Sequence, residues 1–135
     1  MSGLSALTIA DARRALRAGE IGAIELTEAC LAAAEAADAL NAVSALTPER
    51  ARYQASLSAV RLKDGEAPDL CGIPLGIKDL FCVEDAPAQA ASRILEGFRP
   101  PYESTVTRKL WEAGGSLRGC ATPPGRGRPR RRRDP

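Results

Sequence analysis

Lys78 is the ionisable residue whose neighbours in the sequence most favour chemistry. It lies in residues 72–81, where large apolar residues alternate with Pro74, Gly76 and Lys78 in the pattern of a β-strand. Gly76 shares the lysine's face and leaves space beside it. An amine in apolar surroundings loses hydration, which lowers its pKa towards a value that suits a general base. Two interpretations follow: a catalytic base, or a lysine whose stem packs while its ammonium pairs with an acid or reaches water.

Histidine is absent from all 135 residues, and its absence excludes a large class of mechanisms. Neither a Ser–His–Asp site nor a Cys–His site can be built from this sequence. The four cysteines, at positions 30, 71, 82 and 120, include no Cys-x-x-Cys pair, so the common zinc patterns are missing too. We therefore expect reduced thiols, no metal and no cofactor.

The segment around Lys78 is similar to the one that bears the catalytic lysine in amidase-signature enzymes. The resemblance lies in residues 72–81, which read Gly-Ile-Pro-Leu-Gly-Ile-Lys-Asp-Leu-Phe. Enzymes of that family hydrolyse amides with a nucleophilic serine, a bridging serine in a cis peptide and a lysine, a triad that needs no histidine. The resemblance implies that Lys78 is the general base. As a neutral amine it would take the proton of the bridging serine, which takes one from the nucleophile.

Further segments resemble one branch of that family, the A subunits of the glutamyl-tRNA(Gln) and aspartyl-tRNA(Asn) amidotransferases. They are residues 26–29, 40–42, 95–98, 100–106 and 109–114, so the similarity covers about residues 4–119. It implies hydrolysis of glutamine to supply ammonia for tRNA-dependent amidation. It also implies B and C subunits as partners, with tRNA bound indirectly through the complex. Two alternatives stay open: a segment of another amidase-signature enzyme that hydrolyses small amides, or a non-catalytic segment that binds the B subunit or RNA.

Three departures from the family pattern concern the site. Residues 88–92 read Ala-Gln-Ala-Ala-Ser, where the family usually has Thr-Thr-Ala-Gly-Ser. After Gly119 the family continues with Lys-Thr-Asn, whereas this chain has Cys-Ala-Thr. The Gly/Ser-rich stretch that carries both triad serines has no counterpart here. We therefore expect a truncated chain that is inactive by itself as an amidase.

The elements that would position Lys78 begin with three amphipathic helices. Apolar residues recur at spacings of three and four in residues 8–19, 24–38 and 47–65. Thr8 and Thr47 are the predicted N-caps, and Asp11 is the capping partner of Thr8. The predicted buried row of the second helix is Leu26, Cys30, Ala33 and Ala37.

After the strand, residues 82–101 show no period and predict a loop. A fourth helix is expected from about Ser104, with Val106, Leu110 and Ala113 as its buried row. Two glycines end this helix, and residues 116–118 could begin a second strand.

Residues 120–135 differ in character from the rest of the chain. They contain six arginines and one acid, which leaves the preceding residues mildly acidic. Prolines and the lack of any period predict a disordered tail. Its arginines could bind RNA through phosphate contacts. Alternatively, such sequence is what GC-rich coding DNA yields when read out of frame, and the abrupt change after a predicted strand favours this second interpretation.

These patterns together predict an α/β protein, the N-terminal portion of the amidase-signature fold. Helices come first and the first strands of a mixed sheet follow, so the fold is incomplete. The predicted units are residues 1–119, part of an amidase domain, and the tail, residues 120–135. The N-terminus lacks the features of a signal peptide and no apolar run is long enough to span a membrane, so we expect a cytoplasmic protein.

Overall fold

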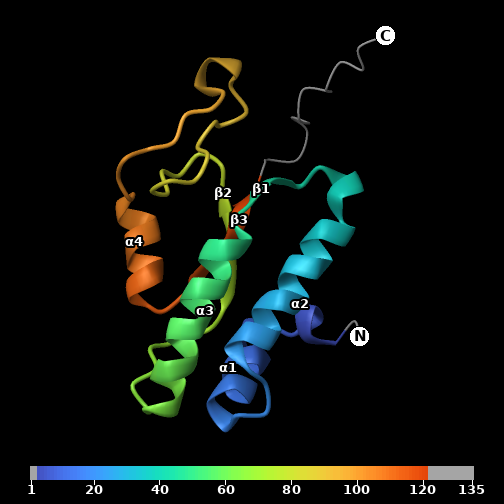
Figure 1. Ribbon diagram of the computed structural model, residues 1–135, viewed down its shortest axis with the longest axis vertical. Coiled ribbons are helices and arrows are strands. Elements are labelled where there is room, and N and C mark those ends of the chain that lie inside the picture. Colours follow the sequence, from blue (N-terminus) through green and yellow to red (C-terminus); the bar gives the residue numbers. More distant parts are fainter. Residues whose placement is uncertain (1–2, 122–135) are drawn as a thin grey trace.

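The computed structural model describes residues 3–121, which form a three-stranded sheet with helices packed around it (Figure 1). The helices are α1 (Ile9–Ala18), α2 (Ala23–Ala36), α3 (Pro48–Lys63) and α4 (Thr105–Glu112). The strands are β1 (Val43–Leu46), β2 (Pro74–Lys78) and β3 (Ser116–Ala121). Short 3-10 turns lie at Leu4–Ala6, Asp38–Leu40 and Arg93–Leu95. This order confirms the predicted α/β class, and residues 82–101 contain no α-helix or strand, as predicted.

The sheet is mixed, with β3 in the middle. Its strand order is β1-β3-β2, and β3 runs parallel to β2 and antiparallel to β1. The predicted second strand is thus present as β3, and it includes Cys120 and Ala121, which the sequence had placed in the tail. The remainder of the predicted tail lies outside the described residues.

Strand β1 was not predicted. It has four residues, one of them the polar Ser44, and so short a segment carries no readable alternation. Its pairing is entirely long-range, because Leu46 lies opposite Gly119 of β3. At Gly119 a Cβ atom would lie 2.5 Å from the carbonyl oxygen of Ala45, so glycine permits this close approach of the two backbones.

Helix α1 begins and ends where local signals predict. The Thr8 hydroxyl accepts a hydrogen bond from the Asp11 backbone N–H at 3.1 Å and donates one to the Asp11 carboxylate at 2.6 Å. Gly19 ends the helix with a φ of 69°, the left-handed conformation that glycine adopts without strain.

The buried faces of α2 and α4 differ from the predicted rows. In α2 the buried residues are Ala23, Leu26, Thr27, Leu31 and Ala34. Of the predicted row only Leu26 is buried, since Cys30, Ala33 and Ala37 are half-buried. Glu25, Glu28 and Glu35 lie on one side of the helix, but the rest of its surface is a broad apolar area within which spacing could not single out the buried row. In α4 the predicted Val106 is 49% exposed, and the neighbouring Thr107 is buried instead.

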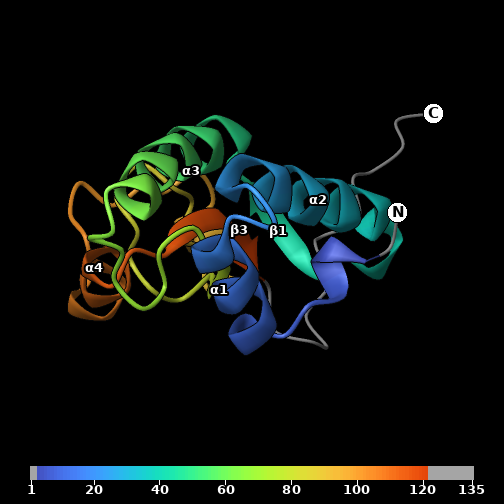
Figure 2. The ribbon, with the colours of Figure 1, turned by 90° about the horizontal axis from the view of Figure 1, so that it is seen from below.

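Helices α2 and α3 lie side by side over the sheet (Figures 1 and 2). Ala51 and Ala55 of α3 are fully buried, and their small side chains let this helix approach β3 closely. Two apolar clusters result. One centres on α1, α2 and Ile73. The other joins Ile77 of β2 to Leu117 of β3, Val83 and Ala86.

Side chains from α3 complete the hydrogen bonding of β3 where β1 ends. Thr47 stands at the N-cap position of α3 but makes no capping bond, contrary to the prediction. Its hydroxyl instead donates to the Leu117 carbonyl at 3.2 Å, and the Leu117 N–H donates to the Gln54 amide oxygen at 2.8 Å. These bonds satisfy buried peptide groups that β1 is too short to reach.

Candidate functional site

Lys78 is the last residue of β2 and is exposed. The predicted alternation is confirmed, since Ile73 and Ile77 are buried on one face while Gly76 and Lys78 are exposed on the other. The expected desolvation of the amine is absent, because the face of β2 that carries it is uncovered. Within residues 3–121 the Lys78 ammonium has no hydrogen-bond or ion-pair partner, and no peptide bond is cis. Among the described residues, therefore, no serine is hydrogen-bonded to the lysine.

The residue after the lysine, Asp79, is buried with 3% exposure. Its carboxylate accepts a hydrogen bond from the Gln89 backbone N–H at 2.8 Å, and its carbonyl accepts one from the Ala90 N–H at 2.9 Å. These bonds attach residues 88–92 directly beside the end of β2. Sequence reasoning missed Asp79, although the period of two that buries Ile73 and Ile77 also puts position 79 on the buried face.

The attached loop, residues 88–92, has an unfavourable backbone. Ala90 and Ala91 have φ values of 47° and 59°, a left-handed conformation that strains residues with a Cβ atom. The pattern that this segment resembles, Thr-Thr-Ala-Gly-Ser, usually has glycine at the position of Ala91. The turn is closed by a 2.7 Å bond from the Ser92 N–H to the Gln89 carbonyl. Asp79 thus holds a strained turn next to Lys78.

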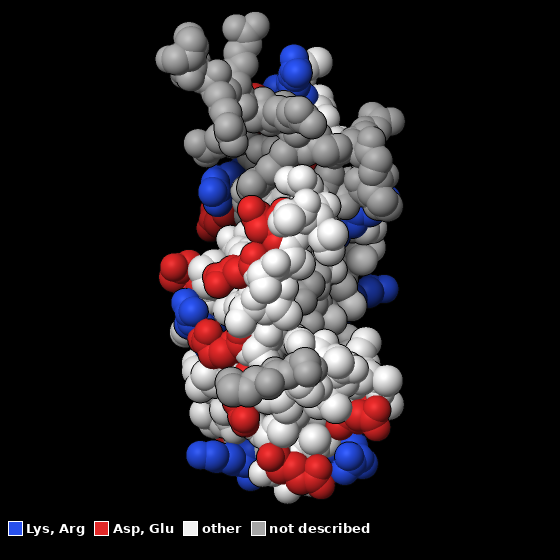
Figure 3. Space-filling model, turned by 90° about the vertical axis from the view of Figure 1, so that its right-hand side faces the viewer, with Lys and Arg blue, Asp and Glu red and all other residues white. Residues whose placement is uncertain are grey.

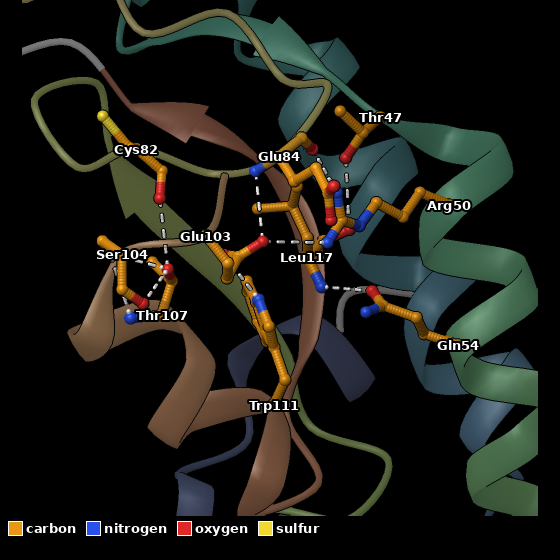
Figure 4. A network of polar contacts seen from close by, with 10 residues as sticks. All are labelled: Thr47, Arg50, Gln54, Cys82, Glu84, Glu103, Ser104, Thr107, Trp111 and Leu117. Atoms are coloured by element: carbon orange, nitrogen blue, oxygen red, sulfur yellow. Dashed lines mark hydrogen bonds and ion pairs between the residues drawn. The ribbon is translucent and has the colours of Figure 1, made fainter. Parts of the chain in front are cut away.

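A second polar network ties the loop after Lys78 to two helices (Figure 4). Glu103 accepts hydrogen bonds from the Trp111 indole at 2.8 Å and from the Glu84 backbone N–H at 3.1 Å. Arg50 of α3 lies 3.6 Å from the Glu103 carboxylate, donates to the Glu84 carbonyl at 2.6 Å and stands 5.9 Å from the centre of the Trp111 ring.

The Glu103 carboxyl is held ionised by these contacts. Burial raises its pKa, but the hydrogen bonds from Trp111 and the Glu84 N–H, together with the charge of Arg50, outweigh burial. The net effect lowers the pKa of Glu103 below its usual value. Because its oxygens are occupied and its side chain is only 16% exposed, Glu103 acts as a structural tie and not as a proton donor.

Comparison with known proteins decides the family. The family model for amidases matches residues 25–123, a range that includes Lys78 and Asp79. The chain belongs to the amidase family. This amidase segment is 57% identical over 119 residues to the A subunit of the glutamyl-tRNA(Gln) amidotransferase of Jannaschia sp. (strain CCS1). It is 60% identical over 119 residues to the same protein of Dinoroseobacter shibae. The resemblance to that branch is confirmed.

Solved amidase structures share the fold of this amidase segment. The native peptide amidase from Stenotrophomonas maltophilia superposes with a TM-score of 0.82 at 30% identity, over 90% of this chain and 26% of that one. A crystal structure of an amidase gives a TM-score of 0.76 at 32% identity, over 86% of this chain and 27% of that one. The two curated subunits are covered over 24% of their length. The segment therefore spans about a quarter of the proteins it matches.

On the side shown in Figure 3, acidic and basic side chains of the described residues are interspersed on the surface of the amidase segment. Across the described part of the chain, no cluster of three or more His, Cys, Asp or Glu residues could hold a metal ion. Among residues 3–121, none of the helices combines the length and the apolar composition needed to cross a membrane.

Proposed function

We propose that this chain is the lysine-bearing quarter of a glutamine-hydrolysing amidotransferase A subunit, with Lys78 as the general base of a Ser–Ser–Lys triad. The observation that carries the proposal is the 57–60% identity to two such subunits over 119 residues. The likeness to a peptide amidase is weaker, at 30% identity, which favours the amidotransferase branch over hydrolysis of other small amides.

The position of Lys78 suits this role. It ends β2 on an exposed face, and Gly76 on the same face contributes no side chain that would block access. A neutral amine there accepts a proton from the bridging serine as the nucleophile attacks the amide. The amide C–N bond breaks as the acyl-enzyme forms, and the nitrogen takes the proton back from the lysine through the bridging serine and leaves as ammonia for use by the B subunit. Water then hydrolyses the acyl-enzyme and releases glutamate. The functional partners are accordingly the B and C subunits and glutamine, tRNA is reached through the complex, and the setting is the cytoplasm.

The chain by itself is inactive in this proposal. A lysine without a nucleophile provides only general-base help, far less than covalent catalysis. The test is ammonia release from glutamine by the purified 135-residue chain, alone and with the B and C subunits of a relative. We expect the rate to equal that of a Lys78→Ala control. Turnover above that control would overturn the claim of inactivity.

A chimera tests the catalytic half of the proposal. Residues 3–121 replace the matching quarter of the Jannaschia protein, and the complex with its own B and C subunits is assayed for glutamine hydrolysis. We expect activity, because the rest of that chain supplies what this segment lacks. A folded chimera that binds its B and C subunits but releases no ammonia would contradict the proposal.

A further inference from the structure

Helix α3 carries large apolar side chains on the face opposite the one that packs on the sheet. Its buried residues are Ala51, Ala55 and Ser58. In contrast, Tyr53 is 65% exposed, Leu57 46% and Val60 57%. Successive residues of an α-helix are about 100° apart around its axis, so these three side chains lie within about 60° of one another and point away from the buried face. We call these three residues the outer row of α3.

The outer row is one continuous surface. Residues three and four apart are neighbours on a helix, so the three side chains follow one another over about 10 Å of its length. Figure 2 shows α3 on the outside of the molecule, with the sheet on its inner side. Single exposed apolar residues are ordinary, but a row at this spacing is the pattern with which one helix packs against another.

Charged side chains at the two ends of α3 indicate what packs on the outer row. Glu49 lies in the first turn and Lys63 in the last, and both are exposed. At about 100° per residue, the two lie to the same side of the outer row. Residue 56 is midway between them, and the row from Tyr53 to Val60 is centred between residues 56 and 57. The charges and the apolar row therefore share one centre.

This shared centre makes the face complementary to itself. A two-fold axis through it, perpendicular to the helix, places a second α3 antiparallel to the first. Tyr53 then lies opposite Val60 of the second copy, and Glu49 lies beside Lys63 of the second copy. The positive N-terminal end of each helix dipole also lies beside the negative C-terminal end of the other. A parallel pair would place like ends of the two dipoles together and would keep Glu49 away from Lys63.

We propose that the outer row of α3 is the interface of a homodimer, in which two copies of this chain pack antiparallel through α3. Burial of the three apolar side chains from each copy drives the association, and the two Glu49–Lys63 pairs set its orientation. One helix face is smaller than the roughly 800 Å² per partner of a stable complex, so the dimer is weak, with a dissociation constant on the order of 100 μM. The interface includes no residue of the proposed active site and does not depend on the proposed function.

The test is sedimentation of the purified 135-residue chain at concentrations from about 10 μM to about 1 mM, which bracket the expected constant. We expect the average mass to rise from that of a monomer towards that of a dimer. Leu57→Glu should weaken the association about tenfold or more, because it places two like charges at the axis. Ile94→Asp is the matched control, since Ile94 is 93% exposed but lies in the loop after β2, and it should leave the association unchanged. A monomer at every concentration, or an equal effect of the two substitutions, would overturn the proposal.

A charge exchange tests the antiparallel arrangement with the apolar row intact. Glu49→Lys and Lys63→Glu should each weaken the dimer about two- to fivefold, because each places like charges side by side. Both changes in one chain should restore the association, since opposite charges then meet again across the axis. Both positions are exposed, so the fold of the monomer is expected to be retained, which circular dichroism checks. A double variant that dimerises no better than the two single variants would overturn the proposed arrangement.

Discussion

The chemistry that Lys78 can perform depends on the groups around it and not on its residue type alone. The alternation that places it on a strand face is present in the structure, yet that face is open and the amine has no partner among the described residues. Whatever role it has therefore depends on groups that residues 3–121 do not provide. Its neighbour Asp79 is the opposite case, a buried carboxylate that holds the adjacent loop.

In the proposed mechanism, Lys78 must accept a proton during glutamine hydrolysis. In the chimera described above, Lys78→Arg should lower glutamine hydrolysis about 100-fold or more, because arginine stays protonated and cannot act as a base. Lys109→Arg on the exposed surface of α4 is the matched control and should leave the rate unchanged. A near-normal rate in Lys78→Arg would mean that Lys78 is not the general base and that it packs or forms an ion pair instead.

The second prediction concerns two buried threonines. The Thr27 hydroxyl is fully buried and has no hydrogen-bond partner among residues 3–121, whereas the Thr107 hydroxyl donates to the Cys82 carbonyl at 3.2 Å. Thr27→Val should raise the free energy of unfolding by about 1 kcal/mol, because it removes an unsatisfied polar group at almost constant volume. Thr107→Val should lower it by about 1–2 kcal/mol. Urea denaturation measures both, and a loss of stability in Thr27→Val would contradict the argument.

At the scale of elements, the backbone of the turn at residues 88–92 is strained, and a substitution to glycine can relieve this strain. Ala91→Gly should raise the free energy of unfolding by about 0.5–1 kcal/mol, since glycine adopts a positive φ without the Cβ penalty. Ala32→Gly is the control, because Ala32 is an exposed helical residue of α2 and the change should cost about 1 kcal/mol. Equal losses in both variants would show that Ala91 is not strained.

The Glu103 network makes the packing of α3 and α4 sensitive to acid. The lowered pKa means that Glu103 contributes stability above its unfolded pKa of about 4.3 and loses it as pH falls through the folded value. Glu103→Gln should therefore cost about 1–3 kcal/mol at neutral pH, where charge-assisted bonds are lost. Below the folded pKa of Glu103, where the carboxyl is protonated in both states, the stabilities of variant and wild type should converge. A difference that stays constant from pH 7 to pH 3 in chemical denaturation would exclude this linkage.

At the scale of the whole molecule, several large apolar side chains of the segment are left exposed by the described residues. Ile94, Leu40 and Tyr53 are each more than half exposed, and one edge of the sheet is open. The isolated chain should therefore melt at a lower temperature than the chimera, in which the remaining part of the amidase fold is present. Circular dichroism on both proteins tests this, and a melting temperature of the isolated chain at or above that of the chimera would contradict it.

Local signals were sufficient for much of the fold. The Thr8 cap, the start of α3 at Pro48, the stop at Gly19 and the loop over residues 82–101 depend on interactions within a few residues, so the sequence alone identified them. The family assignment had the same basis, because the motif at residues 72–81 and the flanking segments are contiguous runs that could be recognised without any contact map.

Tertiary structure decided what depends on residues far apart in the chain. The buried row of α2 is decided by its packing against α3 and the sheet, because the apolar surface of this helix is wider than the row that is buried. Strand β1 forms because β3 pairs with it. The Thr47 hydroxyl makes no capping bond because it donates to the Leu117 carbonyl instead. The exposure of Lys78 has the same origin. Desolvation requires atoms packed over a side chain, and residue type and spacing cannot supply them.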